Sequence, residues 1–260
     1  MSSTINENAT ATSARPREQA GKRAQPGWKV IMKRELAAYF SSPVAYIVGC
    51  FFLLFSGFTL FSTFFIIKRA ELRNFFQMLP VIFSLFIPAL TMRVFSEERR
   101  SGSFETLLTL PVSTADVVTG KYLATLSAAL LMLVPTLSYV LTCRIFGSPD
   151  MGPIVGGYIG SVLLCAAFTA IGLYASSLTR NQIIAFFVAF AICIVLSAIS
   201  NFAVLLPGSL VSFASFISAS SHFESIARGI VDTRDIIYFI SLAAVFFVLT
   251  VRSIENSRKG

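Results

Sequence analysis

Six apolar blocks dominate this sequence and restrict the folds that it can adopt. They cover residues 44–67, 75–92, 122–143, 154–178, 182–206 and 236–251. A helix rises about 1.5 Å per residue, so roughly twenty residues cross a hydrocarbon layer of about 30 Å. Only 13% of the 260 residues are charged, whereas soluble domains carry about 25%. We therefore predict an all-α polytopic membrane protein with six transmembrane helices.

The composition excludes several other classes. A transmembrane β-barrel has alternating segments of about ten residues, and this sequence shows none. The cysteines have no metal-binding spacing, and His222 is the single histidine, so we predict no bound metal. The net charge of +8 comes from Lys and Arg at the ends of the apolar blocks. This distribution favours orientation in a membrane over nucleic-acid binding.

The region before the first span divides into two parts. Residues 1–27 are polar and basic without apolar periodicity, which predicts a disordered tail. Residues 28–40 have apolar side chains on one helical face, which predicts an amphipathic helix in the headgroup layer. Pro43 separates it from the first span; a plain extension of that span is the alternative. The apolar face contains Trp28, Ile31, Met32, Leu36, Tyr39 and Phe40, and the helix also carries Lys29, Lys33, Arg34 and Glu35.

The distribution of Lys and Arg predicts the orientation. The amino-terminal region, the loops after the second and fourth spans, and the carboxy-terminal tail hold 15 of them, and the other three loops hold 6. The positive-inside rule then places both termini on the cytoplasmic side of a bacterial inner membrane. Residues 28–251 form the predicted membrane domain, and residues 252–260 form a short cytoplasmic tail.

The connection between the fifth and sixth spans is the longest on the predicted outer side. Apolar residues recur in it at helical intervals, but Glu224, Arg228 and Asp232 oppose a seventh span. We predict one or two short helices that re-enter or lie on the outer leaflet. In the fourth span, Gly156 and Gly160 form a GxxxG pair that allows another helix to approach closely.

The six spans contain no Asp, Glu, Lys, Arg or His. Ion-driven carriers need ionisable groups near the membrane midplane, and intramembrane metalloproteases or aspartyl proteases need His or Asp there. The spans therefore argue against both classes. If the protein moves a cargo uphill, the energy must enter from outside the membrane.

The predicted cytoplasmic stretch 95–121 has the features of a helical elbow. Ser96 suits a helix cap, and Glu97 and Glu98 then occupy a first turn where the helix dipole favours acids. Gly102 permits a tight turn and Pro111 ends the element. Ser113 to Asp116 suit the cap of a second helix, which leads into the third span. The apolar side of the elbow contains Phe104, Leu107, Leu108 and Leu110.

The same stretch resembles the signature of type-2 ABC exporter permeases. The motif stands here as Glu97–Glu98, Gly102–Ser103, Glu105, Leu107–Leu108, Pro111–Val112–Ser113 and Gly120–Lys121, and Lys33–Arg34–Glu35–Leu36 resembles the family's interfacial helix. The resemblance implies a cytoplasmic coupling helix between spans 2 and 3 that docks on a separate ATPase subunit. The docking residues it implies are Glu97, Glu98, Arg99, Arg100, Gly102, Glu105, Leu107, Leu108 and Pro111.

A second motif resembles the last outer loop of gliding-motility permeases and of a related branch that serves copper-site assembly. Its residues are Ser221, His222, Phe223, Glu224, Arg228, Gly229, Asp232, Arg234, Asp235, Tyr238 and Phe239. His222, Asp232 and Asp235 also suggest a membrane enzyme site, but capping of the outer helices is the favoured interpretation.

These resemblances imply a permease subunit of an ATP-driven exporter. The chain has no phosphate-binding G-x-x-x-x-G-K-[ST] loop, so we predict a non-enzymatic subunit, with ATP and Mg bound by the partner ATPase. A second permease subunit (the same chain or a paralogue), membrane lipids and an auxiliary protein with a periplasmic domain are the other implied partners. The alternative is a membrane anchor or mechanical element that recruits partners without transport.

Overall fold

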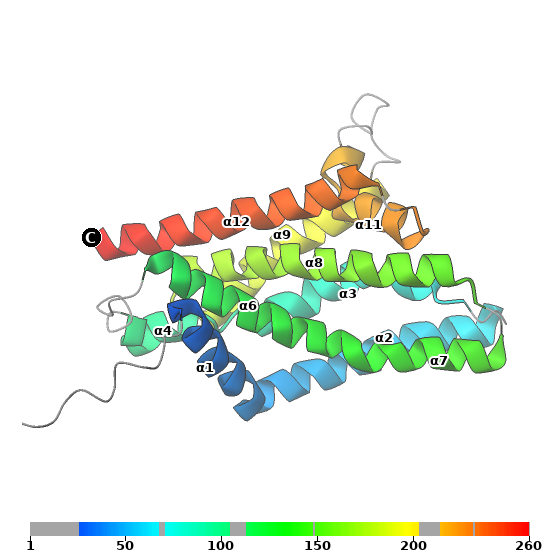
Figure 1. Ribbon diagram of the computed structural model, residues 1–260, viewed down its shortest axis with the longest axis horizontal. Coiled ribbons are helices and arrows are strands. Elements are labelled where there is room, and N and C mark those ends of the chain that lie inside the picture. The colour runs from blue at the N-terminus through cyan, green and yellow to red at the C-terminus, as the bar shows by residue number, and fades with distance from the viewer. Residues whose placement is uncertain are drawn as a thin grey trace, which may run out of the picture.

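The computed structural model describes residues 26–67, 71–104, 113–147, 149–202, 214–230 and 232–259. Within these ranges the regular structure is entirely helical, and six helical segments are long and apolar enough to cross a membrane (Figure 1). The predicted fold class is therefore confirmed. The membrane-crossing helices are α2 (Pro43–Ile67), α3 (Arg73–Thr91), α6 (Thr114–Leu133) continued by η1 (Val134–Thr136) and α7 (Leu137–Phe146), α8 (Met151–Leu178), α9 (Gln182–Phe202) and α12 (Thr233–Lys259).

The helices begin and end close to the predicted boundaries, with two informative differences. The third span is interrupted by the 3-10 turn η1, which contains Pro135. Proline has no N–H to donate to the preceding turn, so a local 3-10 turn accommodates it. The sixth span continues as a helix through most of the predicted tail, to Lys259. Residues 203–206, predicted in the fifth span, lie outside the described residues.

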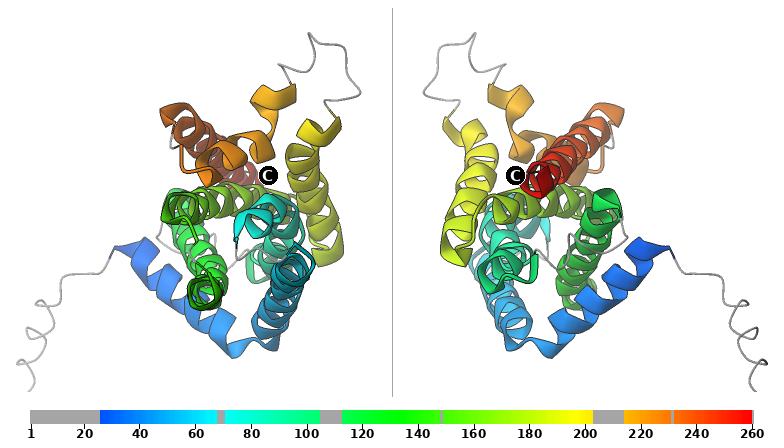
Figure 2. Two further views of the ribbon diagram at one scale, coloured as in Figure 1. Left: turned by 90° about the vertical axis from the view of Figure 1, so that its right-hand side faces the viewer. Right: turned by 90° about the vertical axis from the view of Figure 1, so that its left-hand side faces the viewer.

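Helix α8 is the centre of the bundle. It packs against α3, α6, α9 and α12, and against the short helix α11 (Ala219–Ala227) (Figure 2). The GxxxG pair of α8 is the contact with α11: a β-carbon on Gly156 would overlap the Ile226 carbonyl oxygen, and one on Gly160 would lie 3.1 Å from the Phe223 ring. The predicted close approach is confirmed, and its partner is the short helix α11.

Helix α1 (Gly27–Ser41) runs across the bundle, whereas the spans run along it (Figure 2). It lies against α6. Ile31 is buried in that contact, and Glu35 is on the same side, partly buried among the apolar residues. Phe40, predicted on the apolar face, is 48% exposed. The crossing direction is compatible with the predicted position of α1 in the headgroup layer.

Two clusters of short elements mark the two ends of the bundle. α1, the short helix α4 (Ser96–Ser101), the start of α6 and the end of α12 gather at one end (Figure 1). Toward the other end, residues 214–217 form a helical turn that leads into α11. The Ser218 hydroxyl accepts from the Ser221 N–H and caps α11. These elements match the short helices predicted between spans 5 and 6, and their outer location stays a prediction.

Candidate functional site

Helix α4 is the core of the predicted coupling region. Glu97 and Glu98 occupy its first turn, and Arg99 and Arg100 its last, so each pair of charges complements the helix dipole. Gly102 follows with φ of 74°, a left-handed conformation that favours glycine. The predicted start of the helix and the turn at Gly102 are both confirmed.

The cap of α4 comes from another helix. The Ser176 hydroxyl of α8 accepts from the N–H groups of Phe95 and Ser96, at 3.0 and 3.1 Å. The Ser96 hydroxyl instead donates to the Met92 carbonyl. The prediction that Ser96 caps its own helix is therefore wrong, and α4 is joined to the central helix at its first turn. A hydroxyl 80 residues further along the chain could not be identified from local sequence.

Lys121 joins three elements at this end of the bundle. Its ammonium lies 3.1 Å from Glu35 Oε1 of α1, 2.8 Å from Glu98 Oε1 of α4 and 3.2 Å from the Val94 carbonyl oxygen. The side chain is 1% exposed and also lies 5.2 Å from the Phe95 ring centroid. Three acceptors thus match the three N–H donors of a lysine. We call Lys121, Glu35 and Glu98 the lysine cluster.

Gly120 explains why the cluster forms. A β-carbon at this position would lie 2.8 Å from the Trp28 carbonyl oxygen and 2.9 Å from Ile31 Cβ. The glycine therefore lets α1 approach the backbone of α6, and Lys121, the next residue, meets Glu35. The sequence motif contained this dipeptide, but no role was predicted for Lys121. The sequence feature that could have indicated a role for Lys121 is its position directly before an apolar block.

The charges around Glu35 favour its ionised form. Burial by itself raises the pKa of the Glu35 carboxyl, but Lys121 and Arg34 outweigh burial and the pKa lies below its usual value. Arg34 Nη2 is 3.0 Å from Glu35 Oε1 and 3.8 Å from Glu98 Oε1. The Glu35 carboxylate is therefore ionised at neutral pH, with Lys121 and Arg34 beside it.

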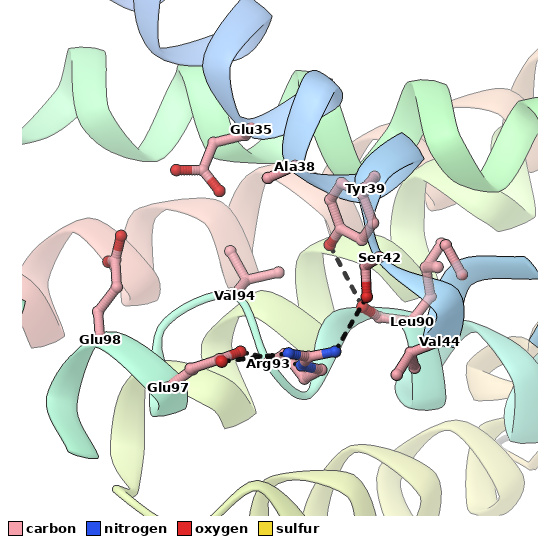
Figure 3. Close-up of a pocket in the computed structure, with 11 residues that line it drawn as sticks. Glu35, Ala38, Tyr39, Ser42, Val44, Leu90, Arg93, Val94, Glu97 and Glu98 are labelled. Atoms are coloured by element: carbon pink, nitrogen blue, oxygen red, sulfur yellow. Dashed lines mark hydrogen bonds and ion pairs between the residues drawn. The ribbon is translucent and has the colours of Figure 1, made fainter. Parts of the chain in front are cut away.

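A cleft of about 170 Å³ lies beside the cluster, between α1 and the α3–α4 segment. Glu35 and Glu98 point toward one another from its two sides (Figure 3). Arg93 forms the floor: it is 2.9 Å from Glu97 Oε2 and donates to the Ser42 hydroxyl at 3.1 Å. The remaining lining residues are Ala38, Tyr39, Val44, Ala45, Leu90 and Val94. Polar contacts through Arg93 and Lys121 thus link α4 to Ser42, which directly follows α1, and to Glu35 within α1.

The other predicted docking residues differ in environment. Arg99 donates to the Ser257 hydroxyl of α12 at 2.8 Å and lies 4.6 Å over the Phe104 ring. Phe104 is buried with Phe95, Val118, Leu173 and Ile254. Arg100 and Gly102 are exposed, together with Glu97. Glu105, Leu107, Leu108 and Pro111 lie outside the described residues.

A comparison with protein families identifies the class of this chain. The model described as "ABC-2 family transporter protein" matches residues 44–259. The chain belongs to this ABC-2 family. The family provides the membrane component of an ABC transporter, and membership implies an ABC ATPase subunit as partner. No curated protein matches the sequence.

The second predicted set of residues lies toward the other end of the ABC-2 protein. His222 Nδ1 is 2.6 Å from Asp235 Oδ1, and its Nε2 is 3.0 Å from the Phe216 carbonyl oxygen. The imidazole also stacks on Tyr238, with ring centroids 4.2 Å apart. His222 and Asp235 therefore join α11 to α12.

The remaining outer residues have separate contacts. Asp232 accepts from the Arg234 N–H at 3.0 Å, as the predicted capping role requires. Arg228 pairs with Glu224 at 2.7 Å, and Gly229 has φ of 86°. Phe223 is buried on α8. In the described part of the chain, no three His, Cys, Asp or Glu side chains are grouped to hold a metal.

Proposed function

We propose that this ABC-2 permease is the membrane subunit of an ATP-driven exporter in a bacterial inner membrane, with both termini in the cytoplasm. α4 is then the coupling helix on which the ATPase docks. The lysine cluster carries this proposal, because it joins the exposed α4 to α1 and to a membrane-crossing helix through one buried cation. A force on α4 is thereby transmitted to both elements.

The mechanism follows from this connection. ATP and Mg bind the partner ATPase pair, and closure of that pair displaces α4. The Ser176 cap and Lys121 tie α4 to α8 and α6, so displacement of α4 moves two spans with it. Binding energy in the ATPase is then converted into a different population of inward- and outward-facing states. A second permease subunit, identical or a paralogue, completes the pathway, and membrane lipids surround it.

The outer-loop motif supports a finer assignment to the gliding-motility and copper-processing branch. The motif residues His222, Phe223, Gly229 and Asp235 all lie in the contacts of α11 with α8 and α12. This outer assembly is also the surface that an auxiliary protein with a periplasmic domain would meet.

The test uses the exposed tip of α4. Arg100→Glu reverses a charge on α4 where the side chain is exposed, and Arg144→Glu is the matched control because it is exposed near the end of α7. Each variant is purified with a candidate ABC ATPase subunit and reconstituted in vesicles. We expect Arg100→Glu to weaken association at least ten-fold and to lower permease-stimulated ATP hydrolysis, whereas Arg144→Glu has no effect. Equal association of both variants refutes docking on α4.

The dependence of ATP hydrolysis on cargo distinguishes a transporter from a membrane anchor. An exporter shows ATP hydrolysis that rises with cargo in the vesicles, and Glu105→Ala with Leu108→Ala removes that rise. An anchor shows normal association and a rate of hydrolysis that no cargo fraction changes.

A further inference from the structure

Arg99 is a partly buried cation of the coupling region, and within the described residues it has no carboxylate partner. Glu97 pairs with Arg93, and Glu98 pairs with Lys121. The guanidinium of Arg99 instead donates to the neutral hydroxyl of Ser257. Its Nε is buried and has no hydrogen-bond partner in the described part of the chain. A buried donor without an acceptor is unfavourable, so an acceptor supplied by a bound partner would stabilise Arg99.

Arg180 adds a second positive charge near Arg99. It lies between α8 and α9, is exposed, and is close enough for its positive charge to act on Arg99. Helix α4 contacts both α8 and α9, which places the turn that carries Arg180 beside α4. Two neighbouring cations repel each other unless an anion lies between them. Guanidinium groups bind planar oxyanions through two parallel hydrogen bonds, which makes a carboxylate or a phosphate the matching ligand.

The depth of this surface favours a protein carboxylate over a lipid phosphate. Ser257, the partner of Arg99, is six residues beyond Val251, the last residue of the final apolar block. Six residues of helix extend about 9 Å. The headgroup layer on each side of a bilayer is about 5–8 Å thick. The Arg99–Ser257 contact therefore lies beyond the lipid phosphates, at the surface that faces a docked cytoplasmic subunit.

We propose that Arg99 and Arg180 together bind an acidic side chain of the ATPase subunit. The turn between α8 and α9 is then a second docking contact, beside α4. This inference rests on the proposed function and adds to it the chemistry of the partner surface. It also assigns a role to Arg180, which no sequence motif identified. Phe104 supports the arrangement, because its ring holds the Arg99 guanidinium at 4.6 Å in a fixed orientation.

The first experiment identifies the partner group by cross-linking. Arg99→Lys and Arg180→Lys each place a primary amine at the site while they keep the charge. The purified permease–ATPase complex is treated with a carbodiimide, which joins amines to carboxylates that are in direct contact. Mass spectrometry of the wild-type complex is the control. We expect a new peptide link from position 99 or 180 to an Asp or Glu of the ATPase. An intact complex without that link overturns the proposal.

The second experiment measures the contribution of the charge. Arg180→Glu should weaken association with the ATPase at least ten-fold. Replacement of the cross-linked Asp or Glu of the ATPase by Arg should restore the association. Arg252→Glu, exposed on the last turns of α12, is the matched control and should retain wild-type affinity. If the wild type binds the ATPase and Arg180→Glu binds it with the same affinity, this inference is wrong but the proposed function stands. Failure of the wild type to bind any ATPase overturns the proposed function as well.

A lipid ligand gives a different result. Association is compared in nanodiscs of phosphatidylcholine alone and in nanodiscs with added phosphatidylglycerol. We expect the effect of Arg180→Glu to be equal in both. An effect that requires the anionic lipid assigns the site to a lipid phosphate and overturns the protein carboxylate.

Discussion

Replacement of Lys121 by Met tests whether the lysine cluster stabilises the coupling region. The side chain is 1% exposed, and its ammonium has three oxygen partners within 3.2 Å. Met fills a similar volume but has no charge, so the substitution leaves the carboxylates of Glu35 and Glu98 facing each other. We expect a large loss of stability, caused by electrostatics rather than by a cavity.

The magnitude follows from the exposure of the two carboxylates. Removal of one partner from a buried ion pair costs about 3–5 kcal/mol. Glu35 and Glu98 keep 17% and 18% of their side-chain exposure, and Arg34 remains nearby as a partial substitute. We therefore expect about 3 kcal/mol, at the low end of that range. For a chain of this size the loss corresponds to a decrease in Tm of about 6–12 °C.

Trp28 provides the assay, because it is the only tryptophan and belongs to α1, which packs on α6. Its fluorescence during heating of the purified protein reports separation of these helices. Lys33→Met is the matched control: Lys33 is on the same helix but exposed, and its replacement should shift Tm by less than about 2 °C. Combining Lys121→Met with Glu35→Gln and Glu98→Gln should recover at least half of the loss, since no buried charge is then left unpaired and Arg34 is exposed to solvent.

Two results would refute this reasoning. A shift in Lys121→Met no larger than in Lys33→Met means that the cluster makes no net contribution to stability. A triple variant as unstable as Lys121→Met alone means that the lost stability comes from packing and not from unpaired carboxylates.

Four further predictions follow from the described contacts. Because the pKa of Glu35 is lower when folded, its contribution is complete above the ordinary glutamate pKa of about 4.3 and is lost as the pH falls through the folded value; Tm should decrease as the pH falls below about 4.3, and less so in Glu35→Gln. Gly120→Ala should cost about 1–3 kcal/mol by forcing α1 away from α6, as measured by thermal unfolding, whereas Gly49→Ala, with open space around it, should not destabilise. Ser176→Ala should cost about 1–2 kcal/mol and speed amide exchange in the first turn of α4, because two N–H groups lose their acceptor. His222→Ala should increase proteolysis in the α11 region, and unchanged cleavage would contradict its role in joining α11 to α12.

The apolar blocks predicted most of the fold because membrane-crossing helices are defined by length and composition alone. The order and approximate limits of the spans, the separate α1 and the short outer helices follow from this local information. The GxxxG pair predicted a close approach but not its partner. The contact with α11 depends on how a segment 70 residues away folds back, and a single-sequence pattern carries no such information.

The candidate site shows the same limit more clearly. Glu35 was placed on a basic helix, but its role depends on Lys121, which is 86 residues away. The amphipathic pattern of α1 could not reveal that a carboxylate belongs to its packed face, because an isolated helix favours that residue in solvent. The roles of Ser176 and Ser257 depend on contacts between helices, and serine is common in membrane spans for many reasons.

Helix α12 has a mechanical consequence for the whole permease. Its 27 residues form one continuous helix, about 40 Å long. Arg99 holds its last turns and His222 its first turns, through Ser257 and Asp235. Such a helix acts as a lever between two attachment points. A tilt of about 5° at the end near α4 displaces the end near α11 by roughly 3–4 Å, by the length that its rise per residue gives. If the ATPase docks on α4 as proposed, a small movement of that subunit is sufficient to shift the opposite end of α12 by this distance.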